Sequence, residues 1–145
     1  MYVVITIAGD PVSWWTESVT DAAELAAELA QGPADVPVID PLKGNLLISA
    51  KASVAIVQVP PSQSWIPSGT QAPVATLYVQ AGPTAGSSGY TLPVGTDLAD
   101  LRNQIRAAMA AGSVIKVPVS SDAGNGIAVL NGGTLTFAVV CPPPS

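Results

Sequence analysis

The sequence predicts an α+β fold in which two similar β-α-β-β-β units pack as one pseudo-two-fold body, with mixed sheets and two helices. Residues 3–61 and 76–143 carry the same landmarks in the same order. Each half also contains one stretch with apolar residues at helical spacing, set among short β-branched runs. Each half alone would be marginally stable, so we expect the two halves to share a core.

The matched landmarks are the ends of strands, the caps of helices and the turns. Ala8-Gly9 returns as Ala81-Gly82, Thr20-Asp21 as Thr96-Asp97, Gly32 as Gly112, Val36-Pro37-Val38 as Val117-Pro118-Val119, Gly44-Asn45 as Gly124-Asn125, and Val59-Pro60-Pro61 as Cys141-Pro142-Pro143. The offset between the copies grows at expected turns, where insertions are tolerated. The alternative is that any two small α+β units share such glycine and proline punctuation.

The first unit is assigned to residues 1–59. Its elements are a central apolar strand at Tyr2–Ala8, a connecting segment with Trp14-Trp15, a helix at Asp21–Gln31, a strand at Val36–Ile39, and a hairpin of Leu46–Ser49 with Ser53–Val59. Asp21 and Glu24 resemble a capping box at the start of the helix. Gly32 is expected to close that helix in the left-handed conformation.

Residues 60–73 form a linker rich in proline and serine, which favours extended structure. Trp65 and Ile66 lie in its middle and are unusual for a free linker. We expect them to attach the segment to one lobe or to a neighbouring subunit.

The second unit is assigned to residues 74–141, and a proline tail to residues 142–145. The elements are a strand at Val74–Gln80, a flexible loop at Gly82–Gly89, a helix at Asp97–Ala111 that ends at Gly112, and strands at Val114–Val119, Gly126–Leu130 and Thr134–Val140. Asn131-Gly132-Gly133 is a strong turn signal between the last two strands.

The chain is poor in charge and rich in apolar residues. Charged residues make up 10% of the chain, against about 25% in an average globular domain. Hydrophobic residues make up 48%, yet no run approaches the length of about 20 residues that a membrane helix needs. The surface must therefore be neutral, and an oligomer or a docked subunit would bury part of it. The alternative is a free monomer with a surface rich in serine and threonine.

The charge balance also limits the class of partner. The net charge is −5, and the five basic residues do not cluster in the sequence. The electrostatic attraction that drives binding to a nucleic-acid backbone is therefore missing. We expect neither nucleic acid nor membrane as partner.

Candidate catalytic and metal-binding residues are scarce. The chain has no histidine and a single cysteine, Cys141, which removes the usual general base and makes a tetrahedral zinc site implausible. No phosphate-binding glycine motif is present. Most carboxylates belong to helix first turns or to loop turns. The sequence therefore predicts no catalytic residue, no metal site, no cofactor and no enzyme activity.

The residues most suited to a protein interface are tryptophans and the proline tail. The candidates are Trp14, Trp15, Trp65, Ile66, Pro142, Pro143 and Pro144. Tryptophan often dominates interface energetics, but it is also a common core residue. Adjacent tryptophans cannot both face one side of a strand, so we expect one to pack inward and the other to cover an edge or to meet a partner.

The composition resembles that of small virion proteins of tailed phages from GC-rich hosts. The shared features are richness in Ala, Val, Pro, Gly and Thr, few lysines, no histidine, an apolar strand at residue 2, and Trp-bearing Pro/Ser segments such as Pro60–Pro73. Among these proteins, capsid decoration (cement) proteins fit the size and the neutral surface. The resemblance implies docking on a capsid lattice, often as a trimer. It transfers no functional residue, because no family motif carries it.

The expected function is therefore structural. The chain is predicted to be a capsid decoration or minor virion protein that stabilises a shell through contacts with itself, as a homo-oligomer such as a trimer, or with a shell protein. It would be assembled in the host cytoplasm, since no secretory signal precedes the first strand. One alternative is a cytoplasmic bacterial module that binds a peptide or small ligand, with Gly82–Gly89 as a mobile loop. A remote alternative is a hydrolase that uses a pair of carboxylates.

Overall fold

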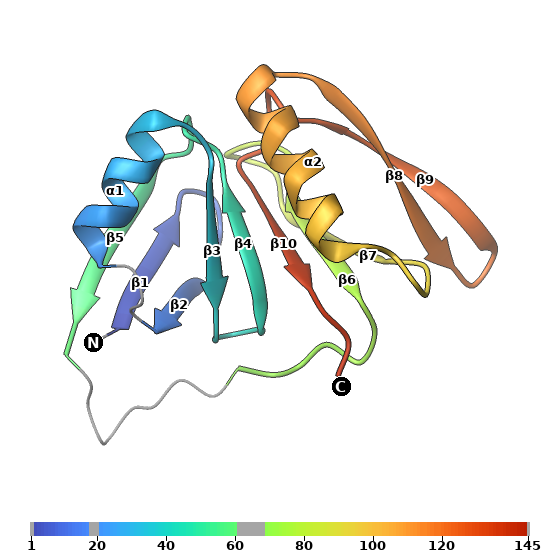
Figure 1. Cartoon of the computed structure of the whole chain (residues 1–145), viewed down its shortest axis with the longest axis horizontal. Helices are drawn as coiled ribbons and strands as arrows, with labels where there is room; N and C mark the ends of the chain where they lie inside the picture. The colour runs from blue at the N-terminus through green and yellow to red at the C-terminus, as the bar shows by residue number, and fades with distance from the viewer. Residues whose placement is uncertain (1, 18–20, 61–68, 145) are drawn as a thin grey trace.

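A computed structural model describes residues 2–17, 21–60 and 69–144 of the chain (Figure 1). Within these residues it contains two helices and ten strands, which confirms the α+β class. The elements are β1 (Tyr2–Ile7), β2 (Ser13–Glu17), α1 (Ala22–Gln31), β3 (Ala34–Val38), β4 (Gly44–Ile48), β5 (Val54–Val59), β6 (Thr76–Gln80), β7 (Ser87–Thr91), α2 (Leu98–Ala111), β8 (Val114–Ser121), β9 (Gly124–Asn131) and β10 (Phe137–Cys141).

Both helices begin at an aspartate, as expected. The Asp21 carboxylate accepts a hydrogen bond from the Glu24 backbone N–H at 2.8 Å, and Asp97 accepts one from Asp100 at 3.0 Å. Each bond satisfies a donor that a helix start leaves unpaired. The two closing glycines differ from each other. Gly112 is left-handed with φ 68°, whereas Gly32 is extended with φ 164°, so the left-handed cap predicted at Gly32 is wrong.

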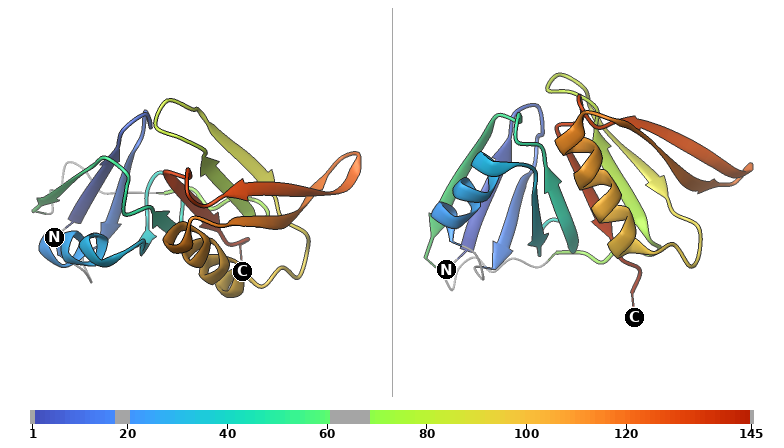
Figure 2. Two further views of the ribbon diagram at one scale, coloured as in Figure 1. Left: turned by 90° about the horizontal axis from the view of Figure 1, so that it is seen from above. Right: turned by 45° about the horizontal axis from the view of Figure 1, so that its top comes forward.

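The strands form two sheets, with orders β2-β1-β5 and β3-β4-β10-β6-β7-β8-β9. All ladders between the described strands are antiparallel, so the expectation of mixed sheets is wrong. A short bridge joins the two sheets: the Trp15 N–H donates to the Asp40 carbonyl at 3.0 Å, and the Ile39 N–H donates to the Trp15 carbonyl at 2.8 Å. Together the strands follow one strongly curved path (Figure 2).

Each half has one more strand than predicted. The segment with Trp14-Trp15 is strand β2 rather than a connection, and β7 occupies part of the predicted Gly82–Gly89 loop. Antiparallel pairing with the preceding strand explains both cases. Gly89 also leaves room for the Tyr78 ring, since a Cβ there would lie 2.9 Å from Tyr78 Cε1. Each half is therefore β-β-α-β-β-β.

The hairpin predicted late in the first half does not form, and the turn predicted at Asn131-Gly132-Gly133 does not join β9 and β10 in a hairpin. Strand β4 lies between β3 and β10, while β5 pairs with β1 at the other end of the half. In the second half, β9 pairs with β8, and β10 lies between β4 and β6. All five residues of β10 are buried, which requires neighbours on both edges and cover on both faces. A terminal hairpin with β9 would not supply that cover.

Two hydrophobic cores lie on opposite faces of the shared strands. The first gathers Val3, Ile5 and Leu25 beneath α1, and the second gathers Leu77, Leu101 and Ile105 beneath α2. Strands β4 and β10 contribute alternate side chains to both cores. Leu46, Ile48, Phe137, Val139 and Cys141 face the first core, and Leu47, Ala138 and Val140 face the second. The two halves are therefore bonded by a ladder and by packing.

Candidate functional site

Acidic and cysteine side chains are spread over the described part of the chain. No group of three or more acidic, cysteine or histidine residues that could hold a metal ion occurs within the described ranges. In that part of the chain, neither helix is long and apolar enough to cross a membrane. Burial raises the pKa of the Cys141 thiol from 9.0 to about 11, so its sulfur stays protonated and unreactive at neutral pH.

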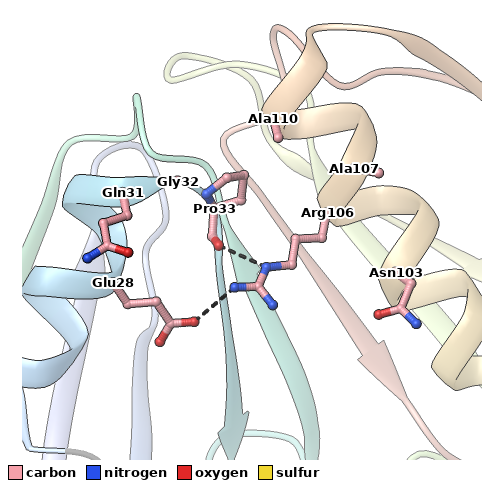
Figure 3. A pocket seen from close by; sticks show the side chains of 8 residues that line it. All are labelled: Glu28, Gln31, Gly32, Pro33, Asn103, Arg106, Ala107 and Ala110. Atoms are coloured by element: carbon pink, nitrogen blue, oxygen red, sulfur yellow. Dashed lines mark hydrogen bonds and ion pairs between the residues drawn. The ribbon is translucent and has the colours of Figure 1, made fainter.

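One ion pair between the two halves lies in a cleft between the two helices (Figure 3). Arg106 reaches from α2 across this cleft of about 460 Å³. Its Nε donates to the Pro33 carbonyl at 3.0 Å, and its Nη2 donates to Glu28 Oε1 at 3.2 Å. Both side chains of the ion pair are well exposed, at 45% for Arg106 and 36% for Glu28. Solvent therefore screens the pair, and it contributes little stability.

A second arginine makes the better-protected link between the halves. Arg102 Nε donates to Asp35 Oδ2 at 3.1 Å, and Asn45 Nδ2 donates to Asp35 Oδ1 at 3.0 Å. The Asp35 side chain is only 15% exposed. Its two carboxylate oxygens are both bonded, which offsets the cost of removing the charge from water. These contacts hold α2 against β3 and β4, so their evident role is to fix the two halves together.

The two tryptophans of β2 point to opposite faces. Trp14 is 4% exposed and packs edge-on against Phe137, with ring centroids 6.2 Å apart. Its Nε1 donates to Asp10 Oδ2 at 2.8 Å. Trp15 is half-buried and lies edge-on to Tyr2 at 6.3 Å. Trp14 is therefore a core residue of this chain, and Trp15 keeps some surface for a partner.

The other predicted interface residues are scattered. Trp65 and Ile66 lie outside the described residues. Pro142, Pro143 and Pro144 are exposed, and the Pro142 carbonyl accepts a hydrogen bond from Gln71 Nε2 at 2.6 Å. Pro143 lines a hollow of about 320 Å³ near the start of α2. Among the described candidates, Trp14 and Pro143 line different hollows.

The exposed apolar surface on the outermost strands was missed by sequence reasoning. Ile127 and Val129 of β9 are 65% and 63% exposed, and Val57 of β5 is 53% exposed. In β9, the alternate residues Ala128 and Leu130 are buried in the second core. Because both faces of β9 carry apolar residues, the sequence pattern indicates a strand buried on two sides. Ile127 and Val129 instead face solvent on a hairpin that projects from the body (Figures 1 and 2).

An apolar groove lies at the opposite end of the molecule, between α1 and β5. Its volume is about 460 Å³. It is lined by aliphatic residues, among them Ala26, Leu29 and Ala30 of the helix and Val54 and Ile56 of the strand. Among the described residues, β5 is hydrogen-bonded to β1 alone and β9 to β8 alone. Strands β5 and β9 are thus edge strands at the two ends of the run of strands, and each carries apolar surface.

A smaller hollow opens onto the first core. It measures about 270 Å³ and is lined by Asp10, Trp14, Tyr78 and Phe137 among others. Aromatic side chains with a carboxylate beside them are typical of pockets for small ligands.

Comparisons of the chain with protein-family models, with curated proteins and with solved structures found no match.

Proposed function

We propose that this chain is a non-catalytic structural protein that works through protein–protein contacts in a larger assembly. The observation that carries the proposal is the apolar surface on the two edge strands, where Ile127, Val129 and Val57 are more than half exposed. Exposed edges of this kind lead proteins to associate unless charge or a covering segment blocks them. Strand β9 carries no charged residue, and neither does β5.

An internal duplication of a β-β-α-β-β-β unit is part of the proposal. The strand orders support it: β5-β1-β2 followed by β3-β4 in the first half, and β10-β6-β7-β8-β9 in the second. The hairpin registers support it as well. Val36 is opposite Leu46, and Val117 is opposite Ala128. In this alignment of the two copies, Gly44 corresponds to Gly126. The sequence motifs alone match Gly44 with Gly124.

The assembly is proposed to be a virion, in which the chain decorates or reinforces a protein shell. The low charge and the richness in Ala, Val, Pro, Gly and Thr support this class. Contacts made by apolar strands depend little on ionic strength. That property suits a shell component exposed to varied media.

Solution mass tests the structural role. Light scattering of the purified chain should give a mass above the 14.5 kDa of a single chain, and raising the salt concentration should not reduce it. A chain that stays monomeric at every concentration, and that does not sediment with virus particles assembled in its presence, would contradict the proposal.

The aromatic hollow favours a second candidate, a module that binds a small apolar ligand. The hollow is lined by Trp14, Tyr78 and Phe137. A fluorescent naphthalene sulfonate probe should then bind at one site, with a single affinity that the change Tyr78→Ala weakens. Absence of saturable binding would dismiss this candidate and would leave the structural role untouched.

A further inference from the structure

We propose that copies of this chain join head to tail, with β9 of one copy adding to β5 of the next as β4 adds to β10 within the chain. The proposal rests on the structural role proposed above and specifies its contact. The observations behind it are the internal β4–β10 ladder, the two edge strands, and the groove beside β5.

The internal ladder is the template. Leu47 of β4 lies opposite Ala138 of β10, is 0% exposed, and enters the second core together with Ile105 of α2. A side chain from one half thus fills the space between the helix and the last strand of the other half. The same kind of space in the first half is the groove between α1 and β5.

The equivalent residues follow from the strand registers. Val36 and Val117 hold matching places, so Leu46 matches Ala128 and Leu47 matches Val129. Ile5 and Leu77 also hold matching places, because each is 0% exposed and lies in the core beneath the helix of its own half. This match shifts the Ala8–Ala81 alignment by one residue, since that alignment would match Ile5 with Tyr78, which packs against the other core. Ile5 lies opposite Ile56, and Leu77 lies opposite Val140. These partners match Val54 with Ala138 and Val57 with Cys141.

Exposure separates the two sets of equivalents. Leu47 and Cys141 are 0% exposed, whereas their counterparts Val129 and Val57 are 63% and 53% exposed. If β9 adds to β5 of the next copy as β4 adds to β10, Val129 lies opposite Val54 of that copy and enters its α1–β5 groove. Val57 in turn is covered by the preceding copy. One contact therefore buries both exposed valines.

A pair of glycines supports the same geometry. A Cβ on Gly44 would lie 2.4 Å from the Val140 carbonyl oxygen, so the close approach of β10 requires glycine there. Its counterpart Gly126 has open space, with Val119 Cγ2 at 3.7 Å as the nearest atom. Within a single chain, no described residue lies close enough to Gly126 to exclude a larger side chain there. The close approach of a strand from a second copy would exclude one.

The polar bonds that join the two halves within a chain have no counterpart in the proposed contact between copies. Arg102 and Arg106 of α2, which bond the two halves, correspond in the helix alignment to Ala26 and Ala30 of α1, and both alanines line the groove. The contact between copies would therefore be apolar. A head-to-tail contact of this type closes a ring, such as a trimer, or continues as a filament.

The test compares four variants of the full chain by light scattering. Gly126→Val removes the space for the approaching strand, and Val129→Glu places a charge in the apolar groove. Gly86→Val and Val94→Glu are the controls: Gly86 has no atom within 4 Å of an added Cβ, and Val94 is 105% exposed. We expect the first two variants to fall to 14.5 kDa and both controls to keep the wild-type mass. Circular dichroism should show that all four are folded.

The outcomes separate the contact from the function. If the wild type is assembled and Gly126→Val and Val129→Glu keep its mass, the β9–β5 contact is wrong, while the structural role stands. If the wild type is monomeric at every concentration, self-pairing is wrong whatever the variants do, and sedimentation with virus particles then decides the structural role.

Cross-linking gives a positive signal. The template register places Asn125 of one copy opposite Gln58 of the next, and both are exposed. A mixture of Asn125→Cys and Gln58→Cys chains should form disulfide-linked pairs under oxidation, and each variant alone should not. Buried Cys141 would not interfere. Equal cross-linking by either variant alone would contradict the head-to-tail arrangement.

Discussion

At the scale of single residues, the two arginines of α2 show that position decides what a charge contributes. Arg102 meets a carboxylate that is 15% exposed, while Arg106 meets one that is 36% exposed. The two arginines lie four residues apart on the same helix. The partners come from residues more than sixty positions away, which no local pattern indicates.

Replacing the better-protected carboxylate should therefore cost more. Asp35→Ala leaves Arg102 and Asn45 without their acceptor, and we expect a loss of about 1–3 kcal/mol in the free energy of unfolding. Glu28→Ala should cost less than about 1 kcal/mol, as exposed pairs do. Urea unfolding of both variants measures the difference, and equal losses would contradict this interpretation.

Cys141 provides a test by pH. Its pKa is about 11 in the folded chain against an ordinary value of 9.0, because burial disfavours the thiolate. Above pH 9 the unfolded chain loses this proton more readily than the folded chain does. The contribution of the protonated thiol to the free energy of unfolding is therefore complete below pH 9 and decreases as the pH rises towards 11. The loss should reach at most about 2–3 kcal/mol.

The comparison for that test is Cys141→Ala, which removes this titration and keeps the other groups that titrate at high pH. The stability difference between the wild type and this variant should narrow or reverse between pH 9 and 11. Thermal unfolding across that range measures it. A difference that is constant with pH would show that the thiol is not protected by burial.

At the scale of elements, the two helix-closing glycines are alike in sequence and different in conformation. Gly112 is left-handed, and Gly32 is extended. At neither glycine would an added Cβ meet another atom closer than 3.9 Å. The two sites therefore differ in backbone conformation and not in available space.

This contrast predicts unequal costs for the same change. Gly112→Ala should lower the free energy of unfolding by about 1 kcal/mol, because a left-handed residue with a Cβ is strained. Gly32→Ala should be neutral or slightly stabilising, since an extended residue of any type is allowed and alanine loses less chain entropy on folding. Chemical denaturation of both variants is the measurement, and a larger loss at Gly32 would refute the assignment.

The elements that sequence predicts well are those set by local chemistry. The spacing of apolar residues and the capping residues predict both helices with their aspartate caps. Short runs of apolar residues predict the strands at Tyr2–Ile7 and Val114–Ser121. Strand pairing is not local. The segments 44–48 and 54–59 look like a hairpin, yet β10 inserts beside the first and β1 takes the second. Only the unbroken apolar run of β10, all five residues of which are buried, hints at this.

The candidate surface is hidden in the sequence for a similar reason. Ile127 and Val129 look like the second face of a buried strand, and in the single chain they are exposed. The aromatic candidates were more visible but less informative. Trp14 is a core residue, and its neighbour Trp15 helps to join the two sheets. The composition predicted that a partner would bury part of the surface, but it did not show which residues form that part.

At the scale of the whole molecule, the fold is a curved run of strands with two open ends. One end presents β9 with exposed valine and isoleucine, and the other presents β5 beside an apolar groove. The middle of the run already contains the contact that would join such ends, the β4–β10 ladder. The proposed contact between copies would cover the apolar side chains of these outermost strands.

The most direct test of that joining is the solution mass of the wild-type chain, measured by light scattering over a wide range of concentration. We predict a mass of two or more times the 14.5 kDa of one chain, and we expect that mass to be insensitive to salt because the joining surface is apolar. A mass of 14.5 kDa at every concentration would contradict the claim that these edges join copies of the chain.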